Sequence, residues 1–307
     1  MKKLVSIVIV NWNSGDYLNQ CITSINQKKI MDSSEIIIVD NNSDDHSLEM
    51  INYIKDIIII KSETNLGFAK ACNLGAKQAS SEFILFLNPD TVFLSNPINP
   101  ILRFMSSTEN TSVGICGIKL LDQNRNVAKS CSRFPSLKSL LVHCLGLDKL
   151  FKSFAAPMLD FDHMQNTEVD QVIGAFFFIR SKLFQMLDGF DESFFVYYEE
   201  VDFSLRAREI GYKSFFLADE EAVHIGGGSS NNVKSTRLFY NLRSRLIFFK
   251  KHHSHFVYFI SILATFIFEF ISRLIYAVML FKKENLLELF KGYFLLHKWF
   301  FFSRKEY

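Results

Sequence analysis

The sequence lacks the cysteine patterns that indicate disulfides or a zinc site. It has five cysteines, an odd number, and no two of them form a C-x-x-C pair. Disulfide frameworks need paired cysteines in an oxidising compartment, and structural zinc sites need closely spaced ligands. We therefore expect free thiols and a reducing compartment.

A strong excess of one charge is also absent. The formal net charge is +2, from 34 basic and 32 acidic residues, and the two signs are mixed along the chain. A protein that binds nucleic acid needs a clustered basic face. We therefore expect no nucleic-acid partner.

No glycine-rich loop follows the first apolar run, Leu4–Val10. The next residues are "NWNSGD", where a dinucleotide-dependent oxidoreductase would have G-x-G-x-x-G and a nucleotidyltransferase a basic, glycine-rich loop. Both classes are therefore disfavoured. A small-x-small cleavage site is missing as well, so we interpret the run as a first buried strand and not as a signal peptide.

Short apolar runs alternate with helical patterns over the first part of the chain. Runs that are almost continuously apolar are typical of parallel strands covered by helices on both faces. Their alternation with helices predicts an α/β domain with a doubly wound, mainly parallel twisted sheet. The predicted strands are Leu4–Val10, Glu35–Val39, Ile57–Ile60, Phe83–Leu87 and Val113–Leu120, and the predicted helices are Asp16–Gln27, His46–Ile54 and Phe68–Ala79.

Polar clusters follow four of these strands. They are Asn11–Asn13, Asp40–Asp44, Asn65–Gly67 and Asn88–Asp90. One such cluster alone would be interpreted as a turn, because asparagine, aspartate, glycine and proline all favour turns. In a doubly wound sheet, however, ligands bind beyond the carboxyl ends of the strands. Four clusters at one edge therefore predict a binding site.

Three further patterns stand in the second half of the chain. Gly174–Ile179 predicts another strand, and Glu199–Ile210 predicts a helix that Gly211 ends. The segment Ala222–Ser230 predicts a short strand followed by a glycine turn.

The C-terminal part begins with basic residues and continues into the apolar stretch Phe256–Phe281. Its length could span a bilayer, but Glu269 and Arg273 interrupt it, and charges at mid-bilayer cost at least about 2.5 kcal/mol each. At helical spacing the two can pair on one face. Three interpretations stay open: an interfacial membrane helix, a helix packed in a soluble core or oligomer, and a true span.

Taken together, the chain resembles a family 2 glycosyltransferase of the GT-A fold, and is most similar to the rhamnosyltransferase-like bacterial members that build cell-surface polysaccharides. The resemblance runs from Val5 to Lys251. It implies a nucleotide-sugar-binding half over residues 1–95 and an acceptor-binding and catalytic half of the same domain over 96–235. The shift in composition predicts a basic and apolar helical tail over 236–307, a C-terminal extension that associates with a membrane or forms oligomers. The stretches that carry the resemblance are "VSIVIVNWNS", "IIIVDNNSDD", "NLGFAKACNLG", "FLNPD", "GAFFFIR", "GFDESFFVYYEEVDFSLR" and "VHIGGGSS".

Asp40 is the candidate base-recognition residue. A carboxylate at a strand end can accept the N3–H of uracil or thymine, a donor that cytosine lacks. The resemblance implies the same contact, and an ordinary capping loop is the alternative. The other residues assigned to nucleotide binding are Asn11, Asn13, Asn42, Asn65 and Asn73.

Asp90 is the candidate carboxylate for Mg²⁺ or Mn²⁺, hard cations that take oxygen ligands and few protein groups when a diphosphate is present. His224 resembles the late histidine that completes this metal site in the family. The sequence departs from the fuller family motif at Asn88, where a first aspartate usually stands, so metal binding could be weaker.

Glu199 and Glu200 occupy the position where the family has its general base. Adjacent helical residues point about 100° apart, so only one is expected to serve. Alignment with the family favours Glu200, with Glu199 as second choice, and a solvated helix start is the alternative. Asp202 and Arg206 follow on the same helix and are spaced for an ion pair.

The resemblance implies an inverting, metal-dependent transfer of one sugar, with rhamnose favoured, from a dTDP- or UDP-sugar to a lipid-linked saccharide. The expected location is cytoplasmic, on the inner face of the membrane, with a homodimer as a further possibility. Processive synthases are disfavoured because Gln-x-x-Arg-Trp and several clear spans are missing. A polyprenyl-phosphate sugar transferase and an inactive scaffold protein remain as alternatives.

Overall fold

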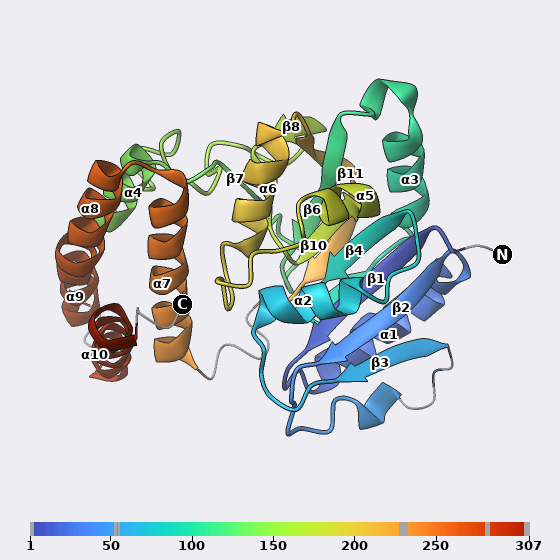
Figure 1. The fold of residues 1–307 in the computed structure, drawn as a ribbon, viewed down its shortest axis with the longest axis horizontal. Coiled ribbons are helices and arrows are strands. Elements are labelled where there is room, and N and C mark those ends of the chain that lie inside the picture. Colours follow the sequence, from blue (N-terminus) through green and yellow to red (C-terminus); the bar gives the residue numbers. More distant parts are fainter. Residues whose placement is uncertain (1–2, 52–53, 55, 227–232, 280–282, 304–307) are drawn as a thin grey trace. The chain divides into compact units, whose positions relative to one another are not determined.

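Four parallel strands form the N-terminal half of the main sheet (Figure 1). The computed structural model describes residues 3–51, 54, 56–226, 233–279 and 283–303. The strands pair in the order β3-β2-β1-β4, and each lies within one or two residues of the range predicted from its apolar run. Their bounds are β1 (Val5–Asn11), β2 (Ser34–Asp40), β3 (Ile57–Lys61) and β4 (Phe83–Leu87).

The other half of the sheet is mixed. β10 runs antiparallel between β4 and β6, whereas β11 pairs in parallel with β6 and antiparallel with β5 and β8. The sequence predicted only the last residues of β11 as a strand, but it extends over twelve residues. The bounds are β5 (Thr91–Phe93), β6 (Val113–Leu121), β8 (Thr167–Val169), β10 (Phe176–Arg180) and β11 (Lys213–His224), and a small second sheet joins β7 (Cys131–Ser132) to β9 (Gln171–Val172).

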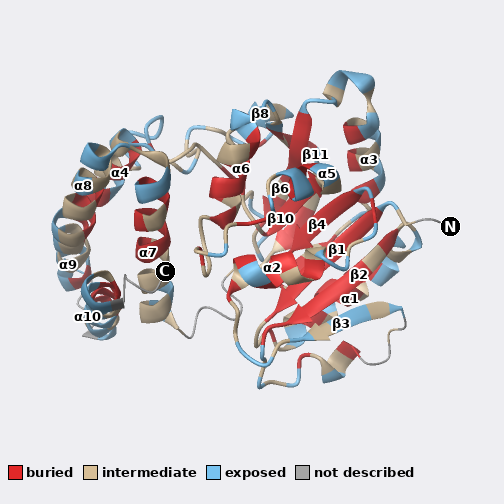
Figure 2. Cartoon of the chain, in the orientation of Figure 1, coloured by how far each residue is buried: buried red, intermediate tan, exposed pale blue. Residues whose placement is uncertain are grey.

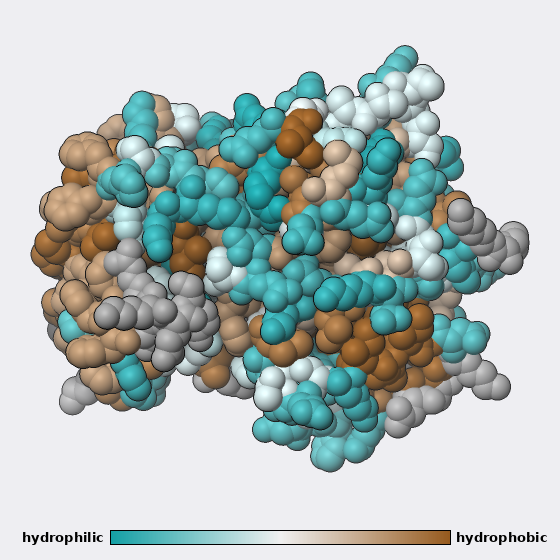
Figure 3. Space-filling model, in the orientation of Figure 1, coloured by the Kyte–Doolittle hydropathy of each residue, from teal (hydrophilic) through white to brown (hydrophobic). Residues whose placement is uncertain are grey.

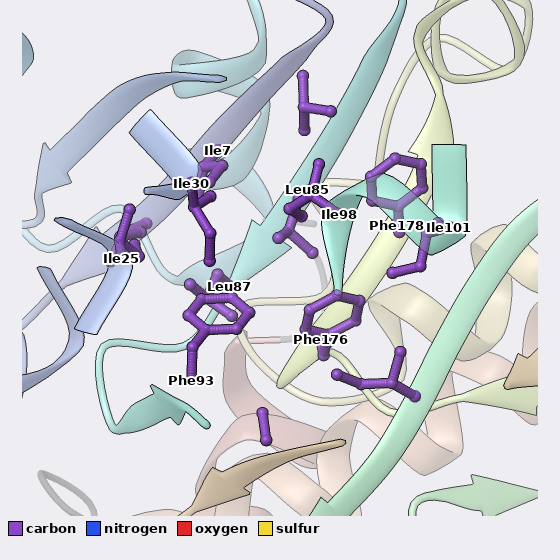
Figure 4. Close-up of a cluster of buried hydrophobic side chains, with 14 of the residues drawn as sticks. Ile7, Ile25, Ile30, Leu85, Leu87, Phe93, Ile98, Ile101, Phe176 and Phe178 are labelled. Atoms are coloured by element: carbon purple, nitrogen blue, oxygen red, sulfur yellow. The ribbon is translucent and has the colours of Figure 1, made fainter. Parts of the chain in front are cut away.

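Helices cover the sheet and enclose a core of aliphatic and aromatic side chains. Figure 4 shows part of this core, with Ile25, Leu85 and Phe176 converging from a helix and two strands. All seven residues of β1 are buried, which explains its continuous apolar pattern. The bounds of these helices and turns are α1 (Asp16–Gln27), η1 (Ile30–Asp32), η2 (Glu49–Ile51), α2 (Phe68–Ala76), α3 (Ile98–Ser106), η3 (Thr108–Asn110), α5 (Ser181–Met186) and α6 (Glu199–Glu209).

The prediction of a helix over His46–Ile54 is wrong. The described residues there form only the short 3₁₀ turn η2, while residues 52 and 53 lie outside the described part. Asp45 accepts hydrogen bonds from both the backbone N–H and the hydroxyl of Ser47, at 3.2 Å and 2.5 Å. Such local side-chain bonds compete with helical hydrogen bonds, which is why the segment stays irregular.

Contacts divide the chain into two compact units. Unit 1 comprises residues 1–132, 162–192 and 199–229, and unit 2 comprises 133–161, 193–198 and 230–307. The C-terminal extension therefore forms one unit with two earlier segments. The division of the sheet domain at residue 95 stays a prediction.

Unit 2 is helical. Apolar residues of α7 and α10 form its core together with residues of the adjoining helices. Its elements are α4 (Leu137–Cys144), α7 (Lys234–His252), α8 (His255–Leu263), the π-helical turn η5 (Ala264–Glu269), α9 (Phe270–Met279), α10 (Lys283–Lys298) and the π-helical turn η6 (Trp299–Ser303).

The apolar stretch of the tail is a continuous helix over α8, η5 and α9, and its two last predicted residues lie outside the described part. Within the described ranges, His255–Met279 is the one helix whose length and composition would allow it to cross a membrane. The predicted pair of Glu269 and Arg273 forms, with 2.7 Å between Arg273 Nη2 and Glu269 Oε1. Glu269 is buried inside unit 2.

Candidate functional site

The register of the sheet places Asn11 beside Asp40, at the carboxyl ends of β1 and β2. Asn11 is fully buried, and its side-chain amide donates to Asp40 Oδ1 at 2.8 Å, to Ser47 Oγ at 2.9 Å and to Ser43 Oγ at 3.1 Å. This buried amide makes its hydrogen bonds to groups within the protein. Asn11 therefore fixes the direction of the Asp40 carboxylate, which is the less enclosed of the two.

The loops after β1 and β2 hold each other. The Asn13 backbone N–H donates to Ser43 Oγ at 3.1 Å, and the Asp44 N–H donates to Asn13 Oδ1 at 2.9 Å. Asn13 and Asn42 both have positive φ, 47° and 63°, a conformation that asparagine tolerates better than most residues. Asn42 is exposed. An open hollow of about 510 Å³ adjoins these loops, lined by Asn13, Ser14, Gly15, Asp16, Tyr17, Gln20, Asp44 and Asp45.

Asn41 is the residue of this edge that the sequence analysis missed. It is buried. Its side-chain nitrogen donates to Asn65 Oδ1 at 2.9 Å, and its side-chain oxygen, Oδ1, accepts the Leu66 N–H at 2.8 Å. It thereby joins the loop after β2 to the loop before α2. Asn65, assigned to nucleotide binding, also accepts the Gly67 N–H at 3.0 Å. The only signal in the sequence was the adjacent pair Asn41-Asn42, and the pair does not reveal which member is buried.

Asn73 lies on α2 and holds the segment that leads toward α6. Its amide donates to the Phe190 carbonyl at 2.8 Å and to Glu192 Oε1 at 3.1 Å, and its own oxygen accepts the Phe190 N–H at 2.9 Å. Both ends of the side chain are thus occupied. A nucleotide contact would have to displace one of these bonds.

Asp90 and His224 meet where β4 and β11 end. Thr91, on β5, pairs with His224 on β11, and this register brings the histidine to the residue that precedes β5. His224 Nε2 lies 3.2 Å from Asp90 Oδ1 and 3.4 Å from the Asn88 side-chain nitrogen. Both side chains are largely buried. Two residues 134 positions apart in the chain are therefore neighbours, as the metal prediction requires.

These two side chains fit a hard divalent cation that retains other ligands. No group of three histidine, cysteine or acidic side chains suited to a metal occurs in the part of the chain that the structure describes. Asp90 and His224 offer one carboxylate and one imidazole at close range, and Mg²⁺ or Mn²⁺ commonly completes its coordination with phosphate oxygens and water. The donor set is therefore compatible with a metal that binds together with a diphosphate.

Glu199 and Glu200 open α6 directly after two tyrosines in a strained backbone conformation. Tyr197 and Tyr198 have φ values of 67° and 72°, which is unfavourable for bulky residues. Glu199 is 4% exposed, and one of its carboxylate oxygens has no hydrogen-bond partner among the described residues. Burial, followed by the charge of Glu200, raises the pKa of the Glu199 carboxyl well above its usual range. Glu200 is half-buried.

The predicted ion pair on α6 is confirmed. Arg206 Nε donates to Asp202 Oδ2 at 2.7 Å, and Asp202 is fully buried. The same guanidinium donates to the carbonyls of Leu187 and Gly189, at 2.7 Å and 2.9 Å. The pair ties α6 to the turn that Asn73 holds from its other side, so the carboxylates at the start of α6 stand on a rigid support.

The candidate site therefore combines Asp40 at the end of β2, the pair of Asp90 and His224 beyond β4, and two acids at the start of α6. The family model of glycosyl transferase family 2 matches residues 6–185, which contain Asp40 and Asp90 but end before α6 and His224. The chain belongs to this family, and the protein is a glycosyltransferase.

Rhamnosyltransferases are among its relatives. The chain is 24% identical over 250 residues to rhamnosyltransferase WbbL of Escherichia coli strain K12, covering 78% of this chain and 90% of WbbL. It is 22% identical over 268 residues to an N-acetylglucosaminyl-diphospho-decaprenol L-rhamnosyltransferase of Mycobacterium tuberculosis, covering 83% of this chain and 86% of that protein. The chain is thus rhamnosyltransferase-like.

A solved structure supports the fold. A mannosyltransferase from Pyrobaculum calidifontis, in complex with GDP-Man and Mn²⁺, superposes with a TM-score of 0.56 at 13% identity, over 97% of this chain and 75% of that one. At this identity the likeness shows the fold alone. The predicted GT-A fold is confirmed, with its mostly parallel sheet, flanking helices and C-terminal helical extension.

Proposed function

We propose that this glycosyltransferase moves one sugar, with inversion, from a dTDP- or UDP-sugar to a lipid-linked saccharide in cell-surface polysaccharide synthesis. The observation that carries the proposal is the contact of Asp90 with His224 at the carboxyl edge of the sheet. That edge also holds Asp40, and the two glutamates stand at the start of α6 in the same unit. These groups match the three tasks of the reaction, which are base recognition, leaving-group neutralisation and deprotonation of the acceptor.

Asp40 is assigned to recognition of the pyrimidine. Asn11 donates to Asp40 Oδ1. Among the described residues, the other carboxylate oxygen has only a long contact of 3.4 Å from the Ser43 N–H. That oxygen can accept the N3–H of uracil or thymine, whereas cytosine presents no donor there. Asn13, Asn42 and Asn65 stay assigned to the nucleotide edge, with Asn11 acting through Asp40. Asn73, predicted at the same edge, is assigned instead to holding the Phe190 segment.

Asp90 and His224 are assigned to the metal. A bound Mg²⁺ or Mn²⁺ would supply positive charge against the diphosphate leaving group. The protein's own contribution is to hold a carboxylate oxygen and an imidazole nitrogen together in a largely buried position. The mannosyltransferase of the same fold was solved with Mn²⁺, which supports a divalent ion as cofactor.

Glu200 is assigned as general base and Glu199 as its alternate. Glu200 is half-buried and can still reach an acceptor hydroxyl, whereas Glu199 is enclosed. In the proposed step the Glu200 carboxylate takes the hydroxyl proton while the acceptor oxygen attacks the anomeric carbon. The diphosphate leaves from the opposite face of the sugar, which inverts the anomeric configuration.

The names of the relatives support the donor sugar and the acceptor class. Both are rhamnosyltransferases, and one carries an N-acetylglucosaminyl-diphospho-decaprenol acceptor in its name. We therefore favour dTDP-rhamnose as donor and a polyprenyl-diphosphate-linked saccharide as acceptor. The alternative is a polyprenyl-phosphate sugar transferase, for which the same Asp40 and Asp90 would serve.

A donor-panel assay tests the proposal. The purified protein is offered dTDP-rhamnose and UDP-, CDP- and GDP-sugars, with lipid-linked saccharide or polyprenyl phosphate as acceptor. We expect turnover with thymidine or uridine donors, transfer to the saccharide, and loss of turnover in excess EDTA or in Asp90→Ala. Full activity in EDTA would overturn the metal assignment, transfer only to polyprenyl phosphate would favour the alternative, and no turnover with any donor would favour a scaffold protein.

A further inference from the structure

Large apolar side chains lie on the outside of α8, α9 and α10 in unit 2. Figure 3 shows such residues on the face in view over α8 and α9. We call the set the apolar surface. Its exposed members are Phe256, Phe259, Ile267, Phe268, Ile271, Ile275, Tyr276, Val278 and Met279 on the long helix, and Leu287, Phe290, Phe294, Phe301 and Phe302 on α10 and η6.

The inward side of the long helix carries small and polar residues at its most buried positions, beside large apolar residues that pack partly buried against the core of unit 2. These apolar residues are Tyr258, Ile262, Phe266, Phe270 and Leu274. The buried positions between His255 and Met279 are Ser261, Ala264, Thr265, Glu269 and Ala277. A surface helix of a water-soluble protein buries its large apolar residues and exposes its polar ones. This helix has large apolar residues on its outer side as well as on its inner side. Figure 2 shows exposed and intermediate residues along α8 and α9. Apolar residues on the outside, with small and polar residues at the closest packing positions, are typical of helices that face lipid.

Glu269 is enclosed by partners within unit 2. Its carboxylate accepts from the guanidinium of Arg245, and from Arg273 Nε at 2.9 Å. Arg245 also donates to Thr265 Oγ1 at 2.9 Å, and both Arg245 and Glu269 are almost fully buried. Glu269 is the one acid between residues 255 and 279. The acid of the long helix is therefore turned inward and neutralised, whereas its partner Arg273 keeps 38% of its side chain exposed.

The π-helical turn η5 keeps the outward residues aligned. Its hydrogen bonds connect residues five apart, so each residue advances the helix by a smaller angle than in an α-helix. The six residues of η5 therefore shift the phase of α9 relative to α8. The positions after the turn can then continue the side that Phe256 and Phe259 begin, and the exposures show that they do.

Basic side chains border this surface at the start of the long helix. Lys250 and Lys251 are exposed at the end of α7, and His255 is exposed at the start of α8. Basic residues next to exposed aromatic residues match the boundary of a bilayer with anionic headgroups. Each basic residue near such headgroups strengthens membrane binding by about 1 kcal/mol.

The packing of unit 2 favours a helix that lies in one face of the bilayer over a helix that crosses it. The long helix packs against α7, whose exposed residues include Lys234, Arg237 and Lys250. A helix that crossed the bilayer would take these charges into hydrocarbon, at a cost of about 2.5 kcal/mol or more for each at the centre. A helix that lies in the interface exposes only its outer side to lipid.

We propose that the apolar surface is the membrane-contact surface of this protein, and that it lies side-on in one leaflet with Glu269 directed away from the lipid. The proposal stands on the geometry of unit 2 and is independent of the reaction. Its test therefore needs no substrate.

The first experiment is flotation of the full-length protein with vesicles of phosphatidylcholine, alone or mixed with phosphatidylglycerol. We expect the protein to float, more strongly with the anionic vesicles. In Phe268→Ser/Ile271→Ser/Ile275→Ser the bound fraction should fall at least tenfold, because each buried apolar side chain contributes about a factor of ten or more. Lys250→Glu should weaken binding to the anionic vesicles only.

Matched controls exclude general effects of lost hydrophobicity. Leu150→Ser/Met164→Ser/Met186→Ser removes three exposed apolar side chains outside the surface and should float like the wild type. Thermal unfolding checks that both triple variants fold. Three outcomes would each overturn the proposal. The wild type could fail to float, the two triple variants could float equally, or the wild type could form a soluble dimer that only the first triple variant dissociates.

Depth measurement separates a side-on helix from a span. The five native cysteines are buried, so a fluorophore can be attached to a single cysteine placed at Phe259, Ile267 or Ile275. Quenching by brominated lipids should report a similar shallow depth at all three positions. A maximum of depth at position 267, with both flanking positions shallow, would show a span and overturn the side-on arrangement.

Discussion

Asn73→Ala tests whether Asn73 binds the nucleotide or supports the catalytic helix. The substitution removes two hydrogen bonds donated by the amide and one accepted by it. Phe190 is 2% exposed, so its N–H and carbonyl would lose their partner in a buried position. Each orphaned buried group costs about 1–3 kcal/mol. Two such groups predict a loss of about 2–6 kcal/mol, with about 4 kcal/mol as the central expectation.

The loss is measured by thermal unfolding and compared with donor binding. In a domain of 150–250 residues, 1 kcal/mol shifts Tm by about 2–4 °C, so we expect a drop of about 8–16 °C. Turnover should also fall, because the Phe190 segment leads to α6 and its two glutamates. The affinity for UDP by calorimetry should stay within about threefold of wild type, since a bond committed to Phe190 adds little to nucleotide affinity.

Asn42→Gly is the matched control. Asn42 carries the same predicted role but is exposed with positive φ, so glycine preserves its conformation and should leave Tm nearly unchanged. If Asn73→Ala abolishes UDP binding while its Tm stays within about 2 °C of wild type, the hydrogen bonds to Phe190 contribute little. Asn73 would then be a direct nucleotide ligand, and the reasoning would be refuted.

Three further predictions concern the ionisable residues Glu200, Glu199 and Arg245. Glu200→Gln should lower kcat by at least about a hundredfold with little change in donor affinity; an inactive Glu199→Gln beside an active Glu200→Gln would reverse the assignment. The pKa of Glu199 is raised in the folded state, so the protein loses stability as the pH rises above about 4.3, the usual pKa of glutamate. Glu199→Gln removes this loss, so it should raise Tm, and the gain should be larger at pH 8 than at pH 5. An equal gain at both pH values would contradict that cause. Arg245→Met should destabilise unit 2 by about 3–5 kcal/mol in urea unfolding, and the double variant with Glu269→Gln should recover part of it; no recovery would show that the two charges do not depend on each other.

Much of the sheet edge could be predicted from sequence, because parallel strands end in polar clusters that have to share one edge. The apolar runs located β1 to β4 nearly to the residue, and the register then brought Asn11 beside Asp40. The assignment of individual asparagines was harder to predict. Asn41 is buried and Asn42 exposed, a difference that depends on the loop before α2 and not on local pattern.

The sequence alone determined the fold class, the family resemblance and the candidate acids, since periodicity and motif order depend on neighbours along the chain. Contacts between distant residues decided the rest. The family resemblance named His224 as a metal candidate, but only the pairing of β11 with β5 brings it next to Asp90. The run from 256 to 281 was apolar in any interpretation, but which side it buries was open. Arg245, twenty-four residues before Glu269, binds that carboxylate and turns the polar side of the helix inward, so that only the tertiary structure exposes the large apolar residues.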